Sequence, residues 1–373
     1  MVESLPERAR KGRGAVTNRS GRFEAETRVA VDDGWGTALP VGAETGGAEE
    51  EVPPPLPTTL MPDSSREIIA RNQSPDVPFD RSINPYRGCE HGCIYCFARP
   101  THAYLGFSAG LDFETHLVVK YDAAVLLQKA LAKPSYKPAP LALGANTDPY
   151  QPQERRLEIT RQVLEVLARC RHPVTIVTKS DLVMRDLDIL APMAEKRLAR
   201  VMISVTTLDR KLARVMEPRA PTPKRRLAAM KALNEAGVPT GILAAPMIPT
   251  LNDSELEALL EAAAEAGAEA AGYVLLRLPL EIRDLFVEWL EQHFPDRKER
   301  VMKLVRETRG GRDYESTYGL RQRGRGVYAD ALAKRFKIAS KRLHLNGESR
   351  GDWDFDCSLF ERPPPDSRQM SLF

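Results

Sequence analysis

Short apolar runs alternate with longer amphipathic stretches along the chain from about residue 80 onward. The apolar runs are rich in branched and aromatic side chains and end at Gly, Pro, Asn or Asp, which predicts buried β-strands. The strand candidates are SINPY (82–86), PLALGAN (140–146), VTIVT (174–178), RVMISVT (200–206), PTGILAAP (239–246) and GYVLLRL (272–278).

The stretches between the strand candidates have helical spacing and helix-end signals. Apolar or small side chains recur with a period of about 3.6 residues at Leu157, Thr160, Val163, Leu164 and Leu167. A second helix is expected to begin with Thr222 as N-cap and Pro223 after it, and to stop at Gly237; a third runs from about Asp253 to Gly267. This alternation predicts an α/β fold with a parallel sheet, either open or closed into a partial barrel, with functional loops at the carboxyl ends of the strands.

Composition divides the chain into four parts. Residues 1–60 combine an Arg-rich start with Gly, Glu and Pro and few apolar side chains, which predicts a largely disordered tail. Residues 61–295 contain the strand and helix repeats. Residues 296–360 are expected to form a basic helical extension, and residues 361–373 a flexible, proline-rich tail.

Hydropathy and charge restrict the location and the partners. The chain of 373 residues is 42% hydrophobic, which is enough to bury a sizeable core. It has no run of 18 apolar residues and no apolar stretch near its N-terminus, so we expect a cytoplasmic protein without a membrane partner. The net charge is only +3, but residues 297–350 carry 16 Lys or Arg against 6 Asp or Glu. Such a segment either follows a DNA backbone or is an ordinary solvated helical surface, and charge alone does not choose.

Three of the five cysteines lie within eight positions, at Cys89, Cys93 and Cys96. This C-x3-C-x2-C pattern directly follows a strand candidate. Thiolates bind soft metals, and three of them on one loop leave a fourth coordination position open. The alternatives are a 4Fe-4S cluster with one open iron, a zinc site completed by His91 or His102, and buried cysteines without a metal.

The cysteine loop resembles that of the radical S-adenosylmethionine (SAM) superfamily. In that family the same spacing follows the first strand of a partial (β/α)6 barrel, usually with an aromatic residue before the last cysteine, and here Tyr95 has that position. The resemblance covers about residues 80 to 290. It implies a TIM-like partial barrel, a 4Fe-4S cluster on the three cysteines, and SAM that is bound to the open iron and cleaved to a 5′-deoxyadenosyl radical. It also implies an electron donor such as flavodoxin or ferredoxin.

The same resemblance implies a SAM-binding set at the strand ends. The second strand ends in GANTDPYQPQE, where Asn146, Thr147 and Asp148 are expected to hold the amino group of SAM. Lys179, Ser204 and Arg219, at or after the third and fourth strands, are expected near its carboxylate and ribose, together with Tyr95 beside the cluster. The alternative is that these polar residues only end strands or lie on the surface, where such residue types are common.

One branch of the superfamily matches further residues. The pattern of spore photoproduct lyases and DNA-repair-photolyase-like proteins is present at Ala98, Arg99, Thr101, His102, Asp112, Phe113 and Glu114. Those lyases carry a hydrogen-donating cysteine at the end of strand two, where this chain has Ala145, so it lacks that donor. Cys357 is the candidate replacement, folded over the barrel mouth, whereas Cys170 has the sequence context of a small core residue.

The last five residues, QMSLF, resemble the peptide by which bacterial polymerases and repair proteins bind the sliding clamp. Gln369 is expected to make polar contacts, while Met370, Leu372 and Phe373 enter an apolar groove. The alternative is a tail that packs on its own domain.

Together these features predict a radical SAM enzyme that acts on nucleic acid, as a DNA-repair lyase or a base-modifying enzyme. The target nucleotide would be flipped or single-stranded. Candidates for stacking on it are Tyr86, Tyr104, Tyr150 and Tyr318. The alternatives are a radical SAM enzyme that acts on RNA, a protein or a metabolite, and a metal-containing adaptor of the clamp without catalytic activity.

Overall fold

A computed structural model of the protein describes residues 10–24, 27, 56–347 and 354–364. Its main sheet has seven strands in the order β10-β9-β8-β7-β6-β3-β2. All neighbours from β3 to β10 are parallel, and β2 pairs antiparallel with β3 at one edge. The strands are β2 (Ile69–Arg71), β3 (Arg81–Ile83), β6 (Leu141–Leu143), β7 (Val174–Thr178), β8 (Ala199–Ser204), β9 (Thr240–Met247) and β10 (Ala270–Leu275).

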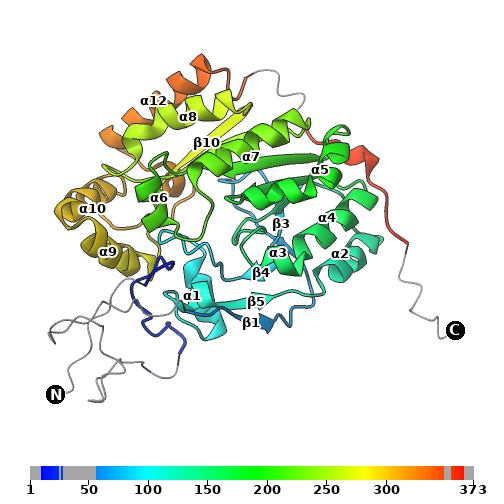
Figure 1. Ribbon diagram of the computed structural model, residues 1–373, viewed down its shortest axis with the longest axis horizontal. Coiled ribbons are helices and arrows are strands. Elements are labelled where there is room, and N and C mark those ends of the chain that lie inside the picture. Colours follow the sequence, from blue (N-terminus) through cyan, green and yellow to red (C-terminus); the bar gives the residue numbers. More distant parts are fainter. Residues whose placement is uncertain (1–9, 25–26, 28–55, 348–353, 365–373) are drawn as a thin grey trace, which may run out of the picture.

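Helices follow the parallel strands and cover one side of the sheet. Figure 1 shows α2, α4, α5, α7 and α8 in an arc along it. Because β10 and β2 do not pair, the curved sheet has an open side, and the prediction of a partial (β/α)6 barrel is confirmed. The helices are α1 (Asp112–Thr115), α2 (Ala123–Ala132), α3 (Glu154–Leu157), α4 (Ile159–Arg169), α5 (Leu187–Ala194), α6 (Arg210–Met216), α7 (Pro223–Glu235), α8 (Leu256–Glu265), α9 (Ile282–His293), α10 (Lys298–Glu307), α11 (Leu320–Arg323) and α12 (Val327–Arg342).

Helix α7 forms where its end signals predict. Thr222 is extended, Pro223 is the first helical residue, and Gly237 follows the helix with a φ of 75°. Glycine adopts this left-handed conformation without steric cost, so the chain can turn directly into β9.

The first predicted strand is divided in two. SINPY was expected as one strand, but β3 ends at Ile83 and β4 (Tyr86–Arg87) belongs to a second sheet. Pro85 lies between them and has no backbone N–H to continue a ladder. The second sheet has the order β1-β5-β4, with β1 (Thr59–Pro62) parallel and β4 antiparallel to β5 (His116–Val119). Its strand β4 leads directly into the cysteine loop.

Part of the N-terminal segment is packed on the domain, which differs from the expectation of a disordered tail over residues 1–60. Arg13 to Thr17 are buried. The backbone N–H groups of Gly14 and Ala15 donate to the Glu114 carboxylate at 3.0 and 2.9 Å. A Cβ on Gly14 would lie 1.8 Å from the carbonyl oxygen of Gly92, so only glycine fits against the cysteine loop here.

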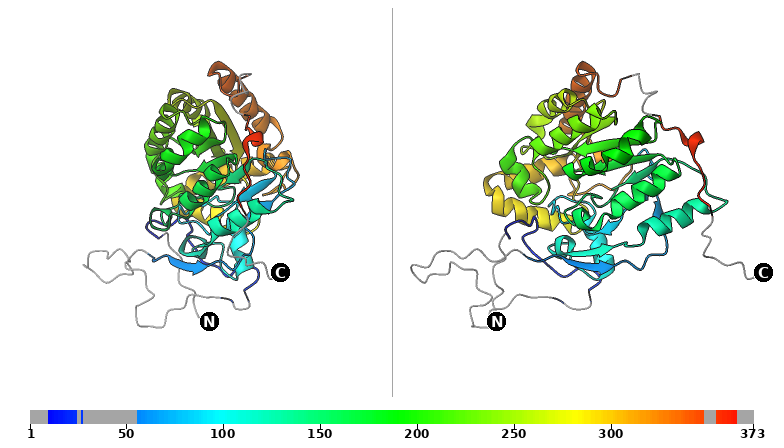
Figure 2. Two further views of the ribbon diagram at one scale, coloured as in Figure 1. Left: turned by 90° about the vertical axis from the view of Figure 1, so that its right-hand side faces the viewer. Right: turned by 45° about the vertical axis from the view of Figure 1, so that its right-hand side comes forward.

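The C-terminal part adds helices beside the open edge of the barrel. Helix α12 packs on α8 and β10, and Figure 2 shows it as the orange helix along the margin of the domain. Residues 354–361 then return to the amino-terminal ends of β7 and β8, where Asp356 N–H donates to the Arg197 carbonyl at 3.2 Å and Glu361 N–H to the Cys170 carbonyl at 2.9 Å. Within the described ranges, no helix is both long and apolar enough to span a bilayer.

Candidate functional site

The cysteine loop is held in place by one buried ion pair. Arg99 contacts Glu114 at 2.5 Å, and neither side chain is exposed. The same guanidinium donates to the carbonyl oxygens of Cys93 at 2.9 Å and Gly92 at 3.2 Å. Gly92 has a φ of 67°, and a Cβ there would lie 2.8 Å from the Glu114 carboxylate. Arg99 and Glu114, noted in the sequence only as part of a family pattern, therefore determine the path of the loop.

The three cysteines of the loop line one cavity of about 1700 Å³. Burial raises the pKa of Cys93 to about 12 and that of Cys89 well above its usual value, and the neighbouring acidic groups and thiols add to the shift at Cys89. A thiol with so high a pKa loses its proton only when a cation is bound beside it. This coupling of cation binding and proton loss is typical of metal ligands. In the described part of the chain, no three His, Cys, Asp or Glu side chains converge on a position for a single metal ion. Thiolates spread over a loop beside open space fit a larger iron–sulfur cluster.

Both carboxylate oxygens of Asp148 bind other groups of the protein. Its Oδ1 accepts from Thr178 Oγ1 at 2.6 Å, and its Oδ2 accepts from the Lys179 N–H at 2.7 Å and lies 3.3 Å from His91 Nδ1. Burial alone would raise the pKa of Asp148, but His91 and these hydrogen bonds hold it at about 2. Thr147 likewise donates its hydroxyl to the Tyr86 carbonyl at 2.7 Å. All three predicted residues at this strand end line the cavity, and Asn146 is the exposed one.

Two other predicted residues lie on the cavity wall near the cysteine loop. Lys179 follows β7 and Ser204 ends β8, and both line the cavity. The Lys179 Nζ atom lies 5.8 Å from the centroid of the Tyr95 ring, which also lines the cavity. The structure thus places six of the predicted residues along the wall of one space with the three cysteines, namely Tyr95, Asn146, Thr147, Asp148, Lys179 and Ser204.

Tyr95 is fixed by a buried network that the sequence interpretation missed. Its hydroxyl contacts the Glu217 carboxylate and lies 3.2 Å from Thr206 Oγ1. Glu217 also forms an ion pair with Arg226, and the two side chains are 0% and 1% exposed. Burial alone would raise the pKa of Glu217, but Arg226 and Lys179 hold it at about 2. The sequence gives only a weak signal for this pair, because ion pairs between helices have no fixed spacing.

Arg219 lies differently from its prediction. It is not among the described residues that line the cavity; its guanidinium is 3.2 Å from Glu90 and its N–H donates to the His91 carbonyl at 3.3 Å. Its role in the structure is to attach the segment after β8 to the cysteine loop. A contact with the ribose or carboxylate of SAM was expected from its position in the sequence, which does not determine the direction of so long a side chain.

Cys357 lines the cavity at the end away from the cysteine loop. Its neighbour Phe355 packs under the Arg200 guanidinium at 4.5 Å, and Arg200 lies at the start of β8. Cys357 was expected over the barrel mouth, but its segment lies at the amino-terminal end of β8, opposite the mouth. Cys170 is buried at 3% exposure, as predicted for a core residue.

The comparisons with known proteins agree with this geometry. The sequence model of the Radical SAM superfamily matches residues 83–263. An uncharacterized protein of Mycobacterium tuberculosis is 40% identical over 232 residues, which are 62% of this chain and 68% of the relative. The chain belongs to the radical SAM superfamily. It is thus a radical SAM enzyme, and the cofactors of this family are a 4Fe-4S cluster and SAM.

More distant relatives and solved structures extend the comparison. An uncharacterized protein of Methanocaldococcus jannaschii is 28% identical over 219 residues, which are 59% of this chain and 78% of the relative. A structure of spore photoproduct lyase complexed with dinucleoside spore photoproduct superimposes with a TM-score of 0.52 at 16% identity, covering 76% of this chain and 79% of the lyase. A mutant of the lyase gives a TM-score of 0.53 at 17% identity, covering 76% and 78%. These structures share the partial-barrel fold of the radical SAM enzyme described here.

Proposed function

We propose that this radical SAM enzyme acts on nucleic acid, on a nucleotide that is flipped out or single-stranded. In this proposal Cys89, Cys93 and Cys96 ligate the cluster. SAM lies along the wall formed by Tyr95, Asn146, Lys179 and Ser204, beside the cysteine loop. The cavity of about 1700 Å³ is large enough for SAM and a nucleotide together.

When bound, the cluster and SAM supply a 5′-deoxyadenosyl radical. The residues of the chain then have positioning tasks. The Asn146 side-chain oxygen suits an ammonium group, the Lys179 ammonium suits a carboxylate, and the Ser204 hydroxyl suits a ribose. Asp148 acts indirectly, because it joins His91 of the cysteine loop to the end of β7. The Glu217 and Arg226 pair keeps the Tyr95 ring on the cavity wall.

The position of the basic extension carries the nucleic-acid part of the proposal. Helix α12 packs against β10, the strand at the open edge of the barrel. Lys334, Lys337 and Lys341 are exposed and are spaced so that they lie along one face of α12. Ion pairs with acidic residues neutralise part of the extension, namely at Lys298, Arg306, Arg321, Arg335 and Arg342. The exposed lysine row of α12 forms no ion pair within the described part of the chain, and in this proposal it attracts a phosphate backbone.

Changing Lys334, Lys337 and Lys341 together to Glu is expected to weaken binding of single-stranded DNA at least about tenfold near physiological salt, because three phosphate contacts become repulsive. Fluorescence anisotropy with a labelled oligonucleotide measures this, and the slope of affinity against salt should also become shallower. The matched control changes the exposed Lys129, Lys133 and Lys137 to Glu, on and just after α2. Equal losses in the two triple variants would contradict a specific role of α12.

The clamp-like peptide gives a separate prediction about recruitment. Gln369, Met370, Leu372 and Phe373 lie outside the described residues. Deleting residues 369–373 is expected to abolish binding to the bacterial sliding clamp, because the polar anchor and all apolar anchors are lost together. Surface plasmon resonance on immobilised clamp measures this, and cleavage of SAM by the truncated protein should be unchanged. Equal clamp affinity before and after the deletion would show that the peptide does not recruit the protein.

A further inference from the structure

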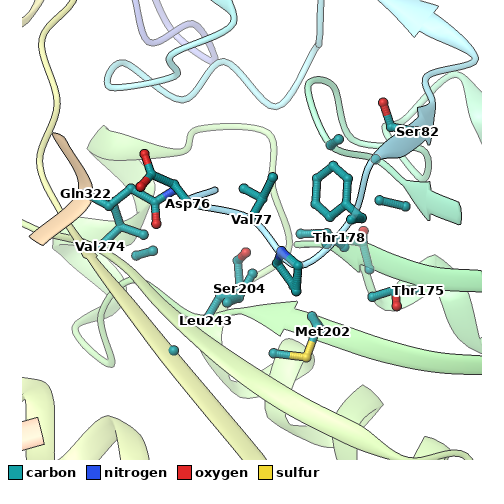
Figure 3. A pocket seen from close by; sticks show the side chains of 18 of the residues that line it. Asp76, Val77, Ser82, Thr175, Thr178, Met202, Ser204, Leu243, Val274 and Gln322 are labelled. Atoms are coloured by element: carbon teal, nitrogen blue, oxygen red, sulfur yellow. The ribbon is translucent and has the colours of Figure 1, made fainter. Parts of the chain in front are cut away.

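Residues 72–80, which we call the crossing segment, connect β2 to β3 and extend over the open side of the barrel. Their sequence, NQSPDVPFD, has two prolines, which disfavours a longer hairpin. Asn72 stabilises the segment from within, because its side chain donates to the Phe79 carbonyl and accepts from the Ser74 N–H, both at 2.8 Å. Figure 3 shows Asp76 beside Gln322 and Val274, with Val77 farther along toward Ser204. The segment therefore reaches from the β3 side of the cavity to β10 at the opposite edge of the sheet.

Asp76 attaches the crossing segment to the far edge. Its carboxylate accepts from the Gly319 N–H at 2.6 Å and from Arg321 Nε, and Arg321 also donates to Ser74 Oγ at 2.5 Å. The Asp76 side chain is 6% exposed and that of Arg321 is 19% exposed. The largely buried Asp76 carboxylate is thus paired with Arg321, which lies at the rim of the cavity.

The arginines at this edge exceed the negative charge that faces them. Arg277 follows β10, and its Nε atom is buried without a hydrogen-bond partner in the described part of the protein. Burial lowers the pKa of Arg277, and the charge of Arg321 lowers it further. Arg309 is fully buried, and burial together with Arg277 lowers its pKa to about 10. Asp76 is the carboxylate that favours the charged form of Arg277. Binding of a further anion would therefore stabilise the charged forms of these arginines.

Aromatic faces lie beside the same arginines. The Arg277 guanidinium is 5.4 Å from the ring centroid of Phe97, which directly follows Cys96 and is 46% exposed. The Arg321 guanidinium is 4.6 Å from the ring centroid of Tyr318, which is 56% exposed. Of the four tyrosines predicted to stack on a base, Tyr318 is thus the one that the structure places beside this cluster. Guanidinium groups next to open aromatic faces are suited to a phosphate and an adjacent base.

We propose that Arg277 and Arg321 form a phosphate-binding subsite of the substrate cavity, that Asp76 covers it in the free protein, and that a phosphodiester of the substrate displaces Asp76 while the neighbouring base stacks on Phe97. This proposal rests on the proposed function, since it assumes that the substrate is a nucleotide. When a phosphate displaces Asp76, Arg321 exchanges a carboxylate for a phosphate, and the buried Arg277 Nε gains an acceptor. The displacement also releases the crossing segment from Gly319 and Arg321 at the start of α11, so that a strand of nucleic acid can enter from the open side.

The test compares variants of the full-length protein with a fluorescein-labelled thymidine dinucleotide joined by one phosphodiester. Asp76→Asn is expected to bind it about tenfold more tightly, because a competing carboxylate is removed. Arg277→Gln and Arg321→Gln are expected to bind it at least about tenfold more weakly. Arg300→Gln, on the exposed surface of α10, is the control and should bind like the original protein.

The directions in which the variants change the affinity for the dinucleotide distinguish this subsite from a purely structural attachment. Asp76→Asn and Arg321→Gln break the same contact, so a structural attachment predicts that both shift the affinity in the same direction. The proposed subsite predicts opposite directions. Shifts in the same direction, or affinities that none of the three variants alters, would overturn it. Thermal melting identifies a variant that fails to fold. If Arg321→Gln does not fold, Arg321→Lys replaces it, because lysine keeps the charge but loses the bidentate contact.

A second ligand distinguishes a failure of the subsite from a failure of the proposed function. A single-stranded DNA of about 20 nucleotides also reaches the lysine row of α12, which a dinucleotide does not. If the long DNA binds and loses affinity in the lysine variant while the dinucleotide shows no opposite shifts, the subsite is wrong and the proposed function stands. If the dinucleotide shows the opposite shifts but long DNA does not bind, the subsite is correct for a smaller substrate with a phosphate group.

Discussion

Replacing Cys93 with Ala is expected to reduce the iron content of the reconstituted protein from about four atoms per chain to nearly none, because two thiolates do not retain the cluster. Iron and sulfide assays together with the visible absorption spectrum measure this loss. The change removes one sulfur from the cavity wall, so the far-ultraviolet circular dichroism should not change. Cys93 contributes a carbonyl to the Arg99 interaction through its backbone, and alanine keeps that carbonyl.

Cys170 provides the matched control for this substitution. It is as buried as Cys89 and Cys93, but it lies at the end of α4 and is not one of the described residues that line the cavity. Cys170→Ala should retain the iron content of the original protein. Equal iron content in Cys93→Ala and Cys170→Ala would show that the loop does not ligate the cluster.

Replacing Glu217 with Ala is expected to lower the free energy of unfolding by about 3–5 kcal/mol, because it leaves the Arg226 charge buried without its acid. The pair is closed from solvent, and Arg226 also donates to the Ser204 carbonyl at 3.1 Å, so the guanidinium is not free to turn toward water. Urea unfolding of the protein measures the change. The Tyr95 hydroxyl loses its acceptor at the same time.

The control for Glu217 lies on the same helix as Arg226. Lys231 and Glu235 form an exposed ion pair at 3.8 Å, with side chains 65% and 66% exposed. Glu235→Ala should change the free energy of unfolding by less than about 1 kcal/mol, since solvent screens such pairs. A cost for Glu217→Ala as small as that for Glu235→Ala would contradict the assignment of Glu217 as a buried anchor of the site.

The main sheet could be predicted because burial leaves a clear pattern in the sequence. Strands such as β7 and β8 are apolar runs with turn residues at their ends, and α7 has both of its end signals. The second sheet was missed because β1 and β4 are only four and two residues long, too short for a pattern of alternation. The docked N-terminal segment was missed because its stability depends on the Glu114 carboxylate, about a hundred positions away in the sequence.

The candidate site was predictable to the extent that its residues are close in sequence. The three cysteines have a spacing that restricts them to one loop, whereas Glu217 and Arg226 meet through packing that no spacing reveals. Asp148 lines the cavity as expected of a residue near SAM, but the sequence did not show that its carboxylate also binds the backbone N–H of Lys179. The contacts of the long Arg219 side chain depend on Glu90, whose position only the folded loop determines.

The measurement that tests the central claim most directly is the formation of 5′-deoxyadenosine from SAM by the anaerobically reconstituted and dithionite-reduced protein, followed by mass spectrometry. The account predicts that the nucleoside forms with Cys89, Cys93 and Cys96 intact, and that it is absent from the Cys93→Ala protein while Cys170→Ala still produces it. If the intact protein with a full complement of iron produces no 5′-deoxyadenosine, or if Cys93→Ala produces as much as the original, the cysteine loop is not the centre at which this chain cleaves SAM.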